Sequence, residues 1–153
     1  MSSLSSTSES NPAGWTPATP CGCDGQHYRA VQMKWHVHPM SVCVAVNGKK
    51  NILKFKINLQ LTPGTVHHAV LVYFVCGICG KENQSAYELT SEGKKSRWGY
   101  YGYSRKIRAG TELNVPYEIV EDIFGEMWTG QYLVNSTCRH WAHRFYNRVV
   151  GAG

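Results

Sequence analysis

One stretch decides the fold of this chain: Val66-His67-His68-Ala69-Val70-Leu71-Val72-Tyr73-Phe74-Val75. It is a nearly continuous apolar run of strand length and rich in β-branched residues, which is typical of a strand buried at the centre of a sheet. Two histidines stand at its beginning. Because neighbouring strand residues face opposite sides, only one of His67 and His68 can reach a given partner.

The flanking segments predict more sheet. Residues 42–46 and 53–61 alternate apolar with smaller or polar side chains on either side of the turn dipeptide Asn47-Gly48, which predicts a β-hairpin with one solvated face. Residues 85–90 can return as a partner strand for the apolar run. The first half of the domain is therefore predicted to be mainly β.

Two amphipathic helices are predicted in the last third. Pro116 stands where a helix would begin, and apolar residues follow it at helical spacing as far as Met127. A second helix is predicted over residues 137–150, ahead of which 131–134 is a short strand. Its apolar stripe consists of Cys138, Trp141, Ala142, Phe145 and Val149. Together these elements predict an α+β fold, a small antiparallel β-sheet with two packed helices.

Cys138 is the first residue of that stripe, directly after Asn135-Ser136-Thr137, each of which can cap a helix. A thiol in the first helical turn lies near the positive end of the helix dipole, which favours the thiolate. It becomes a good nucleophile only beside a base or an imidazolium. The other interpretation is a small buried hydrophobic residue, which is what most single cysteines are.

The segment Tyr132-Leu133-Val134-Asn135-Ser136-Thr137-Cys138-Arg139-His140-Trp141 resembles the Cys motif of the H-box/NC family. That family includes lecithin:retinol acyltransferase, the small thiol phospholipase/acyltransferases and the 2A proteins of some picornaviruses. The segment His67-His68-Ala69-Val70-Leu71-Val72 is similar to the family's H-box, with His67 at the H-box position. Glu88 is the closest match to the third polar residue. The resemblance covers roughly residues 65–150 and implies a circularly permuted papain-like (NlpC-type) arrangement.

The resemblance also implies a chemistry. His67 would hold the proton of Cys138, and Glu88 would orient the imidazole. Cys138 would attack an ester or amide carbonyl and form a thioester, which water or another acceptor then resolves. His68 is the alternative base, and whether the site is an active enzyme stays open.

Three features set the chain apart within this family. Thr137 replaces the Asn of the motif, and Arg139 replaces the usual acidic residue and adds a positive charge that would lower the thiol pKa. No hydrophobic tail follows the last predicted helix, whereas the cellular lipid enzymes use such a tail as an anchor. We therefore expect a picornavirus-type 2A non-structural protein that acts in viral RNA replication or host-factor interaction and not as a protease. The alternatives are a thiol-dependent acyltransferase or phospholipase and a single-stranded RNA-binding module.

The segment 94–108 interleaves six positive charges with four aromatic side chains and contains no acidic residue. Such a mixture suits single-stranded RNA, whose bases stack on rings and whose phosphates pair with cations. A solvated strand edge whose tyrosines cover the core is the alternative. The residues predicted to bind nucleic acid are Lys94, Lys95, Arg97, Trp98, Tyr100, Tyr101, Tyr103, Arg105, Lys106 and Arg108.

Several cysteines and histidines could hold a metal. Cys76-Gly77-Ile78-Cys79-Gly80 has zinc-knuckle spacing, and Cys21-Gly22-Cys23 with His27 could supply two more ligands. Free thiols at a strand end and in a loop are the interpretation that the sequence favours, so no metal or other cofactor is assigned. His36-Val37-His38 is interpreted as an alternating strand with partly exposed rings rather than as a ligand pair.

The totals fit one folded domain of 153 residues, with 42% hydrophobic and 17% charged residues. Residues 1–20 are rich in Ser, Thr and Pro and predict a disordered arm, which leaves a domain over 21–153 with an N-terminal extension over 21–64. Residues 21–40 carry no clear pattern. Without a secretory signal or a membrane-spanning run, we expect a cytoplasmic protein (host-cell cytoplasm if viral). A net charge of +6 favours anionic partners, namely RNA or transiently an anionic membrane, besides host or viral proteins.

Overall fold

The computed structural model describes residues 14–39, 45–46, 49–50, 66–102, 106–129 and 138–153. Its strands are β1 Trp15–Pro17, β2 Tyr28–Pro39, β3 Ala45–Val46, β4 Lys49–Lys50, β5 Val66–Cys76, β6 Glu82–Thr90, β7 Gly93–Tyr101 and β8 Lys106–Pro116. The helices are η1 Gly25–His27 (a single 3-10 turn), α2 Tyr117–Glu126 and α3 Cys138–Ala152.

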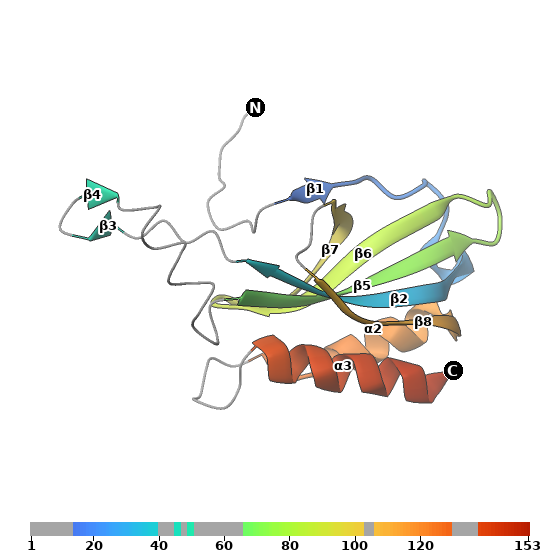
Figure 1. Cartoon of the computed structure of the whole chain (residues 1–153). Helices are drawn as coiled ribbons and strands as arrows, with labels where there is room; N and C mark the ends of the chain where they lie inside the picture. Colours follow the sequence, from blue (N-terminus) through green and yellow to red (C-terminus); the bar gives the residue numbers. More distant parts are fainter. Residues whose placement is uncertain (1–13, 40–44, 47–48, 51–65, 103–105, 130–137) are drawn as a thin grey trace.

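Six strands form one antiparallel sheet in the order β1-β7-β6-β5-β2-β8, and β3 pairs with β4 separately. The helices α2 and α3 lie together on one side of the sheet (Figure 1). This arrangement confirms the predicted α+β class, an antiparallel sheet with two packed helices. Neither helix among the described residues is long and apolar enough to cross a membrane.

The apolar run that predicted a central strand forms β5, in the interior of the sheet between β2 and β6. Alternate residues face opposite sides of the sheet. Val70 and Val72 belong to the core cluster that contains the α3 residues, whereas Ala69 and Leu71 belong to a second, smaller cluster. Because both faces are covered, the strand carries apolar residues at nearly every position, and the prediction of a buried central strand is confirmed.

The predicted apolar stripe of α3 is buried against the sheet and α2, except for Cys138 at its head, which is partly exposed. Trp141 and Phe145 stack with ring centroids 5.3 Å apart, and neither exposes any surface. Burying side chains of this size stabilises the fold by roughly 1.5–3 kcal/mol each. The helix α2 begins directly after Pro116, as predicted, and ends at Glu126. Residues 131–134, predicted as a short strand, lie outside the described residues.

The first strand corrects the predicted extent of the N-terminal arm. Residues Trp15–Pro17 pair with Gly99–Tyr101 at the edge of the sheet, so the arm does not extend to residue 20. This pairing depends on Gly99, whose φ is +148° and whose position leaves no space for a side chain. A Cβ there would lie 2.5 Å from the carbonyl oxygen of Thr16 and 2.6 Å from the Trp15 ring. Three residues are too short a segment to show a strand period in the sequence.

The segment without a clear pattern, residues 21–40, contains η1 and the long strand β2. Predicted alternation over His36-Val37-His38 is present, but the expectation of partly exposed rings is wrong. His36 is 5% exposed and His38 is fully buried, since the ring centroid of His38 lies 3.9 Å from that of Tyr101 and 5.6 Å from that of His36.

The predicted hairpin of residues 42–61 is described only near its turn. Ala45 pairs with Lys50 and Val46 with Lys49, so the two strands β3 and β4 bracket Asn47-Gly48 as predicted. Residues 53–61, the predicted return strand, lie outside the described residues.

Candidate thiol site

Cys138 is the first residue of α3, and this end of the helix lies beside the beginning of β5. The Cys138 Sγ atom is 3.7 Å from the carbonyl oxygen of Val66, to which the protonated thiol can donate. The imidazole of His67, the next residue of β5, lies close enough to the thiol for each group to shift the pKa of the other. The structure therefore brings together the thiol and the histidine that the sequence pairs.

His67 is held on its other side by Glu88 of β6. The His67 Nε2 atom lies 2.6 Å from Glu88 Oε1, and His67 is 5% exposed while Glu88 is fully buried. Tyr87 pairs with Val70, so Glu88 lies opposite Ala69 on the neighbouring strand. His67 is two residues from Ala69 and shares its face of β5, so His67 and Glu88 lie on the same face of the sheet. All three predicted site residues, Cys138, His67 and Glu88, thus form one connected chain of contacts.

The Glu88 carboxylate accepts two further hydrogen bonds from β7. The hydroxyl of Tyr101 donates to Oε1 at 2.7 Å, and the Arg97 guanidinium donates to Oε2 at 2.9 Å. Both Glu88 oxygens are therefore engaged. A carboxylate that accepts several hydrogen bonds, one of them from a cation, is stabilised in its charged form even when it is buried.

These contacts shift the pKa of each of the three site residues so that its charged form is favoured. Burial alone would lower the pKa of an imidazole, but the hydrogen bonds and charges of Cys138 and Glu88 outweigh it and raise the pKa of His67 to about 9. Burial likewise opposes charge on Glu88, yet its hydrogen bond with His67 and the nearby cations lower its pKa to about 2. Burial raises the pKa of the Cys138 thiol, and the hydrogen bond and charge of His67 reverse this and bring it below its ordinary value. The site favours an imidazolium beside a thiolate.

Backbone amides add to this effect. The backbone N–H groups of His68 and of Cys138 itself lower the pKa of the thiol, so both favour the thiolate. They lie where the N-terminus of α3 meets the start of β5, so their dipoles point at the same place. The Val66 carbonyl oxygen beside the sulfur is an acceptor, and it favours the protonated thiol instead.

The alternative base, His68, is engaged elsewhere. Its Nδ1 atom accepts a hydrogen bond of 2.9 Å from the indole N–H of Trp35. Burial, followed by the positive charges of His67, Arg108 and Arg139, lowers the pKa of His68 to about 4. His68 therefore stays neutral. The positive charge of Arg139, which was predicted to lower the thiol pKa, lowers the pKa of this histidine.

Sequence reasoning missed the support of Glu88. Arg97 and Tyr101 were assigned to nucleic acid, yet both side chains contact Glu88. Trp15 of β1 covers this pair: its ring lies 4.1 Å from the Arg97 guanidinium carbon and 5.0 Å from the Tyr101 ring centroid. One signal was available, since positions 97 and 101 are an even number of residues apart and so share a face of a strand.

Two more residues of the predicted RNA-binding segment serve the fold. Lys94 donates to the carbonyl groups of Phe124, Gly125 and Met127 at 2.8, 2.9 and 2.8 Å, which caps the end of α2. Trp98 packs against the main core cluster.

The other residues of this segment are less engaged. Lys95 is half-buried and pairs with Glu92, and Tyr100, Lys106 and Arg108 are exposed, although the Arg108 guanidinium carbon lies 5.0 Å from the Trp35 ring centroid. Tyr103 and Arg105 lie outside the described residues. RNA binding stays a prediction, now centred on the exposed part of the segment.

Among the described residues, one group of side chains has the geometry to hold a metal ion: Cys21, Cys23, Cys76 and Cys79. Of the five candidate ligands that the sequence suggested, the structure brings these four together. His27 is not in the group. Its backbone carbonyl instead accepts a hydrogen bond from the amide of Gly77 at 2.8 Å.

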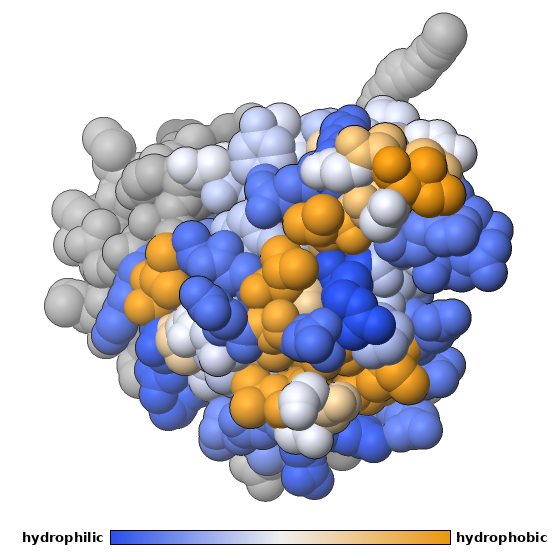
Figure 2. All heavy atoms as spheres, turned by 90° about the vertical axis from the view of Figure 1, so that its right-hand side faces the viewer, coloured by the Kyte–Doolittle hydropathy of each residue, from blue (hydrophilic) through white to orange (hydrophobic). Residues whose placement is uncertain are grey.

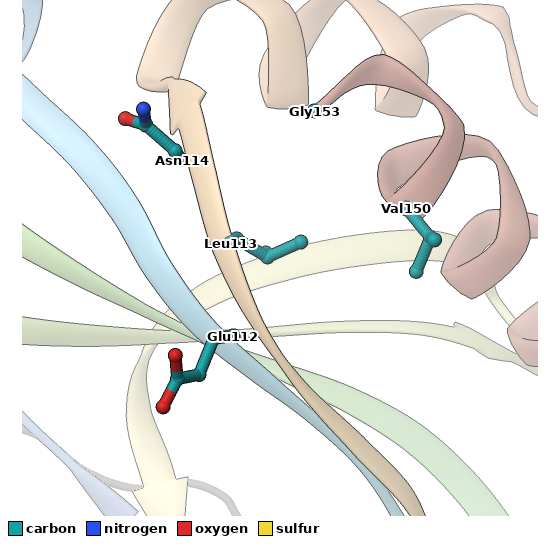
Figure 3. Close-up of a pocket in the computed structure, with 5 residues that line it drawn as sticks. All are labelled: Glu112, Leu113, Asn114, Val150 and Gly153. Carbon is teal, nitrogen blue, oxygen red and sulfur yellow. The ribbon is translucent and has the colours of Figure 1, made fainter.

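A shallow hollow of about 290 Å³ lies between β8 and the end of α3 (Figure 3). It is lined by Glu112, Leu113, Asn114, Val150 and Gly153. Val150 is twelve residues beyond Cys138, which corresponds to about 18 Å along the helix. The hollow is therefore separate from the thiol site.

The chain was compared with protein-family models, curated proteins and solved structures, and none of them matches it.

Proposed function

We propose that this protein carries a thiol site for acyl transfer, with Cys138 as the nucleophile, His67 as its proton acceptor and Glu88 as the group that holds His67. One observation carries the proposal: the imidazole of His67 interacts with the Cys138 thiol on one side and with Glu88 on the other. A nucleophile, a base and a group that orients the base are the minimal parts of this chemistry.

The reaction follows from the contacts. Glu88 engages Nε2 of His67, so Nδ1 exchanges the proton with Cys138. The thiolate attacks an ester or amide carbonyl, and the resulting oxyanion collapses to a thioester while His67 gives its proton to the leaving oxygen or nitrogen. His67 then takes a proton from water or an acceptor hydroxyl, which attacks the thioester and releases the acyl group and the thiol.

Backbone N–H groups would stabilise the negative charge that develops during the reaction. The amides of His68 and Cys138, which lower the thiol pKa, would also favour negative charge on the attacked carbonyl, and the N-terminus of α3 adds its dipole. Donors held in position before the reaction stabilise the transition state without reorganising. Thr137, at the position of the motif's Asn, lies outside the described residues.

We further propose that the chain is an H-box/NC-type protein of the picornavirus 2A kind, with a circularly permuted papain-like arrangement. The order along the chain supports this: His67 at the start of a strand, Glu88 on the next strand, and Cys138 at the head of the last helix. On this proposal it is a non-structural protein of the host-cell cytoplasm that acts in viral RNA replication or host-factor interaction and not as a protease. The rival to the 2A assignment is a thiol acyltransferase or phospholipase whose substrates are lipid esters, and it would use the same site.

The proposal is tested by looking for an acyl adduct on Cys138. The folded chain is incubated with an activated ester, and peptides are examined by mass spectrometry for an acyl group on Cys138. We expect the adduct in the wild type and in His68→Gln, and a much slower reaction in His67→Gln. The proposal fails if Cys138 acquires no adduct, or if His67→Gln acylates as fast as the wild type.

A further inference from the structure

Four cysteines from two distant segments meet at one end of the sheet. Cys21 and Cys23 lie between β1 and η1, Cys76 ends β5, and Cys79 lies in the turn that leads to β6. Their four Sγ atoms all lie within 4.8 Å of one another. Four sulfurs around a zinc ion at bonds of about 2.3 Å are separated by about 3.8 Å, so the group has nearly the dimensions of a tetrahedral site.

The turn that carries Cys76 and Cys79 is shaped to present both sulfurs. The amide of Ile78 donates to Cys76 Sγ at 3.3 Å, and the amide of Gly80 donates to the Cys76 carbonyl at 2.9 Å. Gly80 has a φ of +75°, a conformation that favours glycine and lets the chain turn back into β6. Amide donors to a ligating sulfur stabilise its thiolate form, which is the form that binds metal.

Asn83 of β6 fixes Cys21 from the other segment. Its Oδ1 atom accepts a hydrogen bond from the Cys21 amide at 3.0 Å, and its Nδ2 atom donates to Cys21 Sγ at 3.6 Å. The Tyr28 hydroxyl donates to the Cys21 carbonyl at 3.0 Å. A buried side chain that holds both the backbone and the sulfur of a cysteine is the kind of outer support that metal ligands receive.

The four cysteines lie where they can cross-link the segment that connects β1 to β2. β1 lies at one edge of the sheet beyond β7, whereas β2 pairs with the far side of β5, so residues 18–27 must cross the end of three strands (Figure 1). Seen from this end, hydrophobic and hydrophilic residues are interspersed on the surface (Figure 2). η1, the one helical turn in the crossing, has no buried residue. Cys21 and Cys23 are only partly buried against the core, so a cross-link between the crossing segment and the β5–β6 turn would add to the little apolar packing that holds this segment.

We propose that Cys21, Cys23, Cys76 and Cys79 bind one structural zinc ion. Binding forms four Zn–S bonds, releases the thiol protons to water and changes no oxidation state. With four protein ligands the ion has no open position, so it does not take part in catalysis. It is also remote from the thiol site, because Cys76 and His67 are nine residues apart on β5, or roughly 30 Å.

The alternative for such a group is oxidation to disulfides. The five cysteines among the described residues are all free. Zinc and disulfides differ in what they leave behind: a zinc site keeps four thiols and holds a metal, whereas two disulfides consume the thiols and exclude the metal. Both can therefore be measured in the same sample.

The decisive experiment measures zinc in the full chain, purified without chelator under reducing conditions. We expect about one zinc ion per chain in the wild type and in Cys138→Ser, and little or none in Cys76→Ser and Cys21→Ser. Cys138→Ser is the matched control, because it removes a thiol outside the cluster.

A second readout covers variants that fail to fold. Wild-type chain refolded with Co²⁺ in place of zinc should show the strong visible absorption and the sulfur-to-cobalt charge-transfer band of a tetrahedral thiolate site. A folded wild type that contains no zinc and gives no such spectrum overturns the proposal. So does intact-mass evidence of disulfides among these four cysteines in the reduced preparation.

Discussion

His67 Nε2 lies 2.6 Å from Glu88 Oε1, and neither side chain is appreciably exposed to solvent. Because Arg97 and Tyr101 also donate to this carboxylate, its negative charge is fixed beside the imidazole. The buried charge in turn keeps His67 protonated and the Cys138 thiol acidic. The acidity of the thiol is thus set on β6, at Glu88, two contacts away from the sulfur.

The pKa of Cys138 should depend on His67 and not on His68. In the wild type, the rate of Cys138 alkylation, followed by peptide mass spectrometry, should rise with a midpoint below pH 9, the ordinary thiol value. His67→Gln removes the imidazolium, so the midpoint should move up and the rate at pH 7 should fall roughly tenfold or more. His68→Gln is the control and should leave the midpoint unchanged. Equal curves for the wild type and His67→Gln would refute the coupling.

Glu88→Gln should cost about 3–5 kcal/mol of unfolding free energy, because it leaves His67 and Arg97 without their buried counter-charge. Glu82→Gln on the same strand is exposed and should change the unfolding free energy by less than about 0.5 kcal/mol. Urea unfolding at matched pH measures both variants.

The size of the Glu88→Gln effect should vary with pH. The folded-state pKa of Glu88 is lowered from 4.5 to about 2, so its contribution is complete above pH 4.5 and is lost as pH falls towards 2. The pKa of His67 is raised from 6.5 to about 9, so its contribution is complete below pH 6.5 and is lost as pH rises through 9. The difference from the wild type should therefore be largest between pH 4.5 and 6.5. A difference that does not vary with pH would contradict this.

Gly99→Ala should detach β1 from the sheet. A Cβ at this position would lie 2.5 Å from the Thr16 carbonyl oxygen, and its φ of +148° disfavours any side chain. Gly110→Ala on β8 is the matched control, since a Cβ there would be 3.6 Å from Lys34 and Met33. Hydrogen–deuterium exchange of residues 14–20 should be faster in Gly99→Ala only. Unchanged protection in that variant would mean that β1 accommodates the methyl group.

If the basic segment binds single-stranded RNA, it should do so through its exposed residues. We expect the double change Lys106→Glu/Arg108→Glu to weaken binding of a labelled oligonucleotide at least about tenfold and to reduce its dependence on salt. Lys94→Met should leave the affinity unchanged but lower stability by about 1–2 kcal/mol, because Lys94 caps α2. Fluorescence anisotropy over a range of salt concentrations distinguishes these outcomes. An affinity that does not change with salt concentration would exclude contacts to the phosphates.

Removal of zinc should destabilise the fold without changing the chemistry of the thiol. Chain unfolded and refolded with a chelator should unfold at a temperature several degrees lower, and added zinc should restore the midpoint. The Cys138 alkylation midpoint should stay the same, because the cluster lies at the opposite end of β5. A shift of that midpoint on zinc removal would show that the two sites are coupled.

The elements that the sequence predicted well are those whose evidence is local. The apolar run from Val66 and the stripe of α3 repeat with the period of a strand or a helix, and both elements lie where they were expected. Cys138 at the head of its helix follows from the same periodicity. Glu88 and His67 were chosen by resemblance to a family motif, and the structure brings them within hydrogen-bonding distance.

The tertiary structure alone decided which distant residues meet. Cys21 and Cys76 are 55 residues apart and share a cluster only because β1 and β2 lie on opposite sides of β5. Arg97 and Tyr101, which look like an RNA-binding surface in the sequence, face Glu88 because of the register between β6 and β7. Sequence periodicity determines which face of an element is buried, but strand order and register are set by contacts across the whole chain, so the partners of a buried charge or a thiol emerge only from the complete sheet.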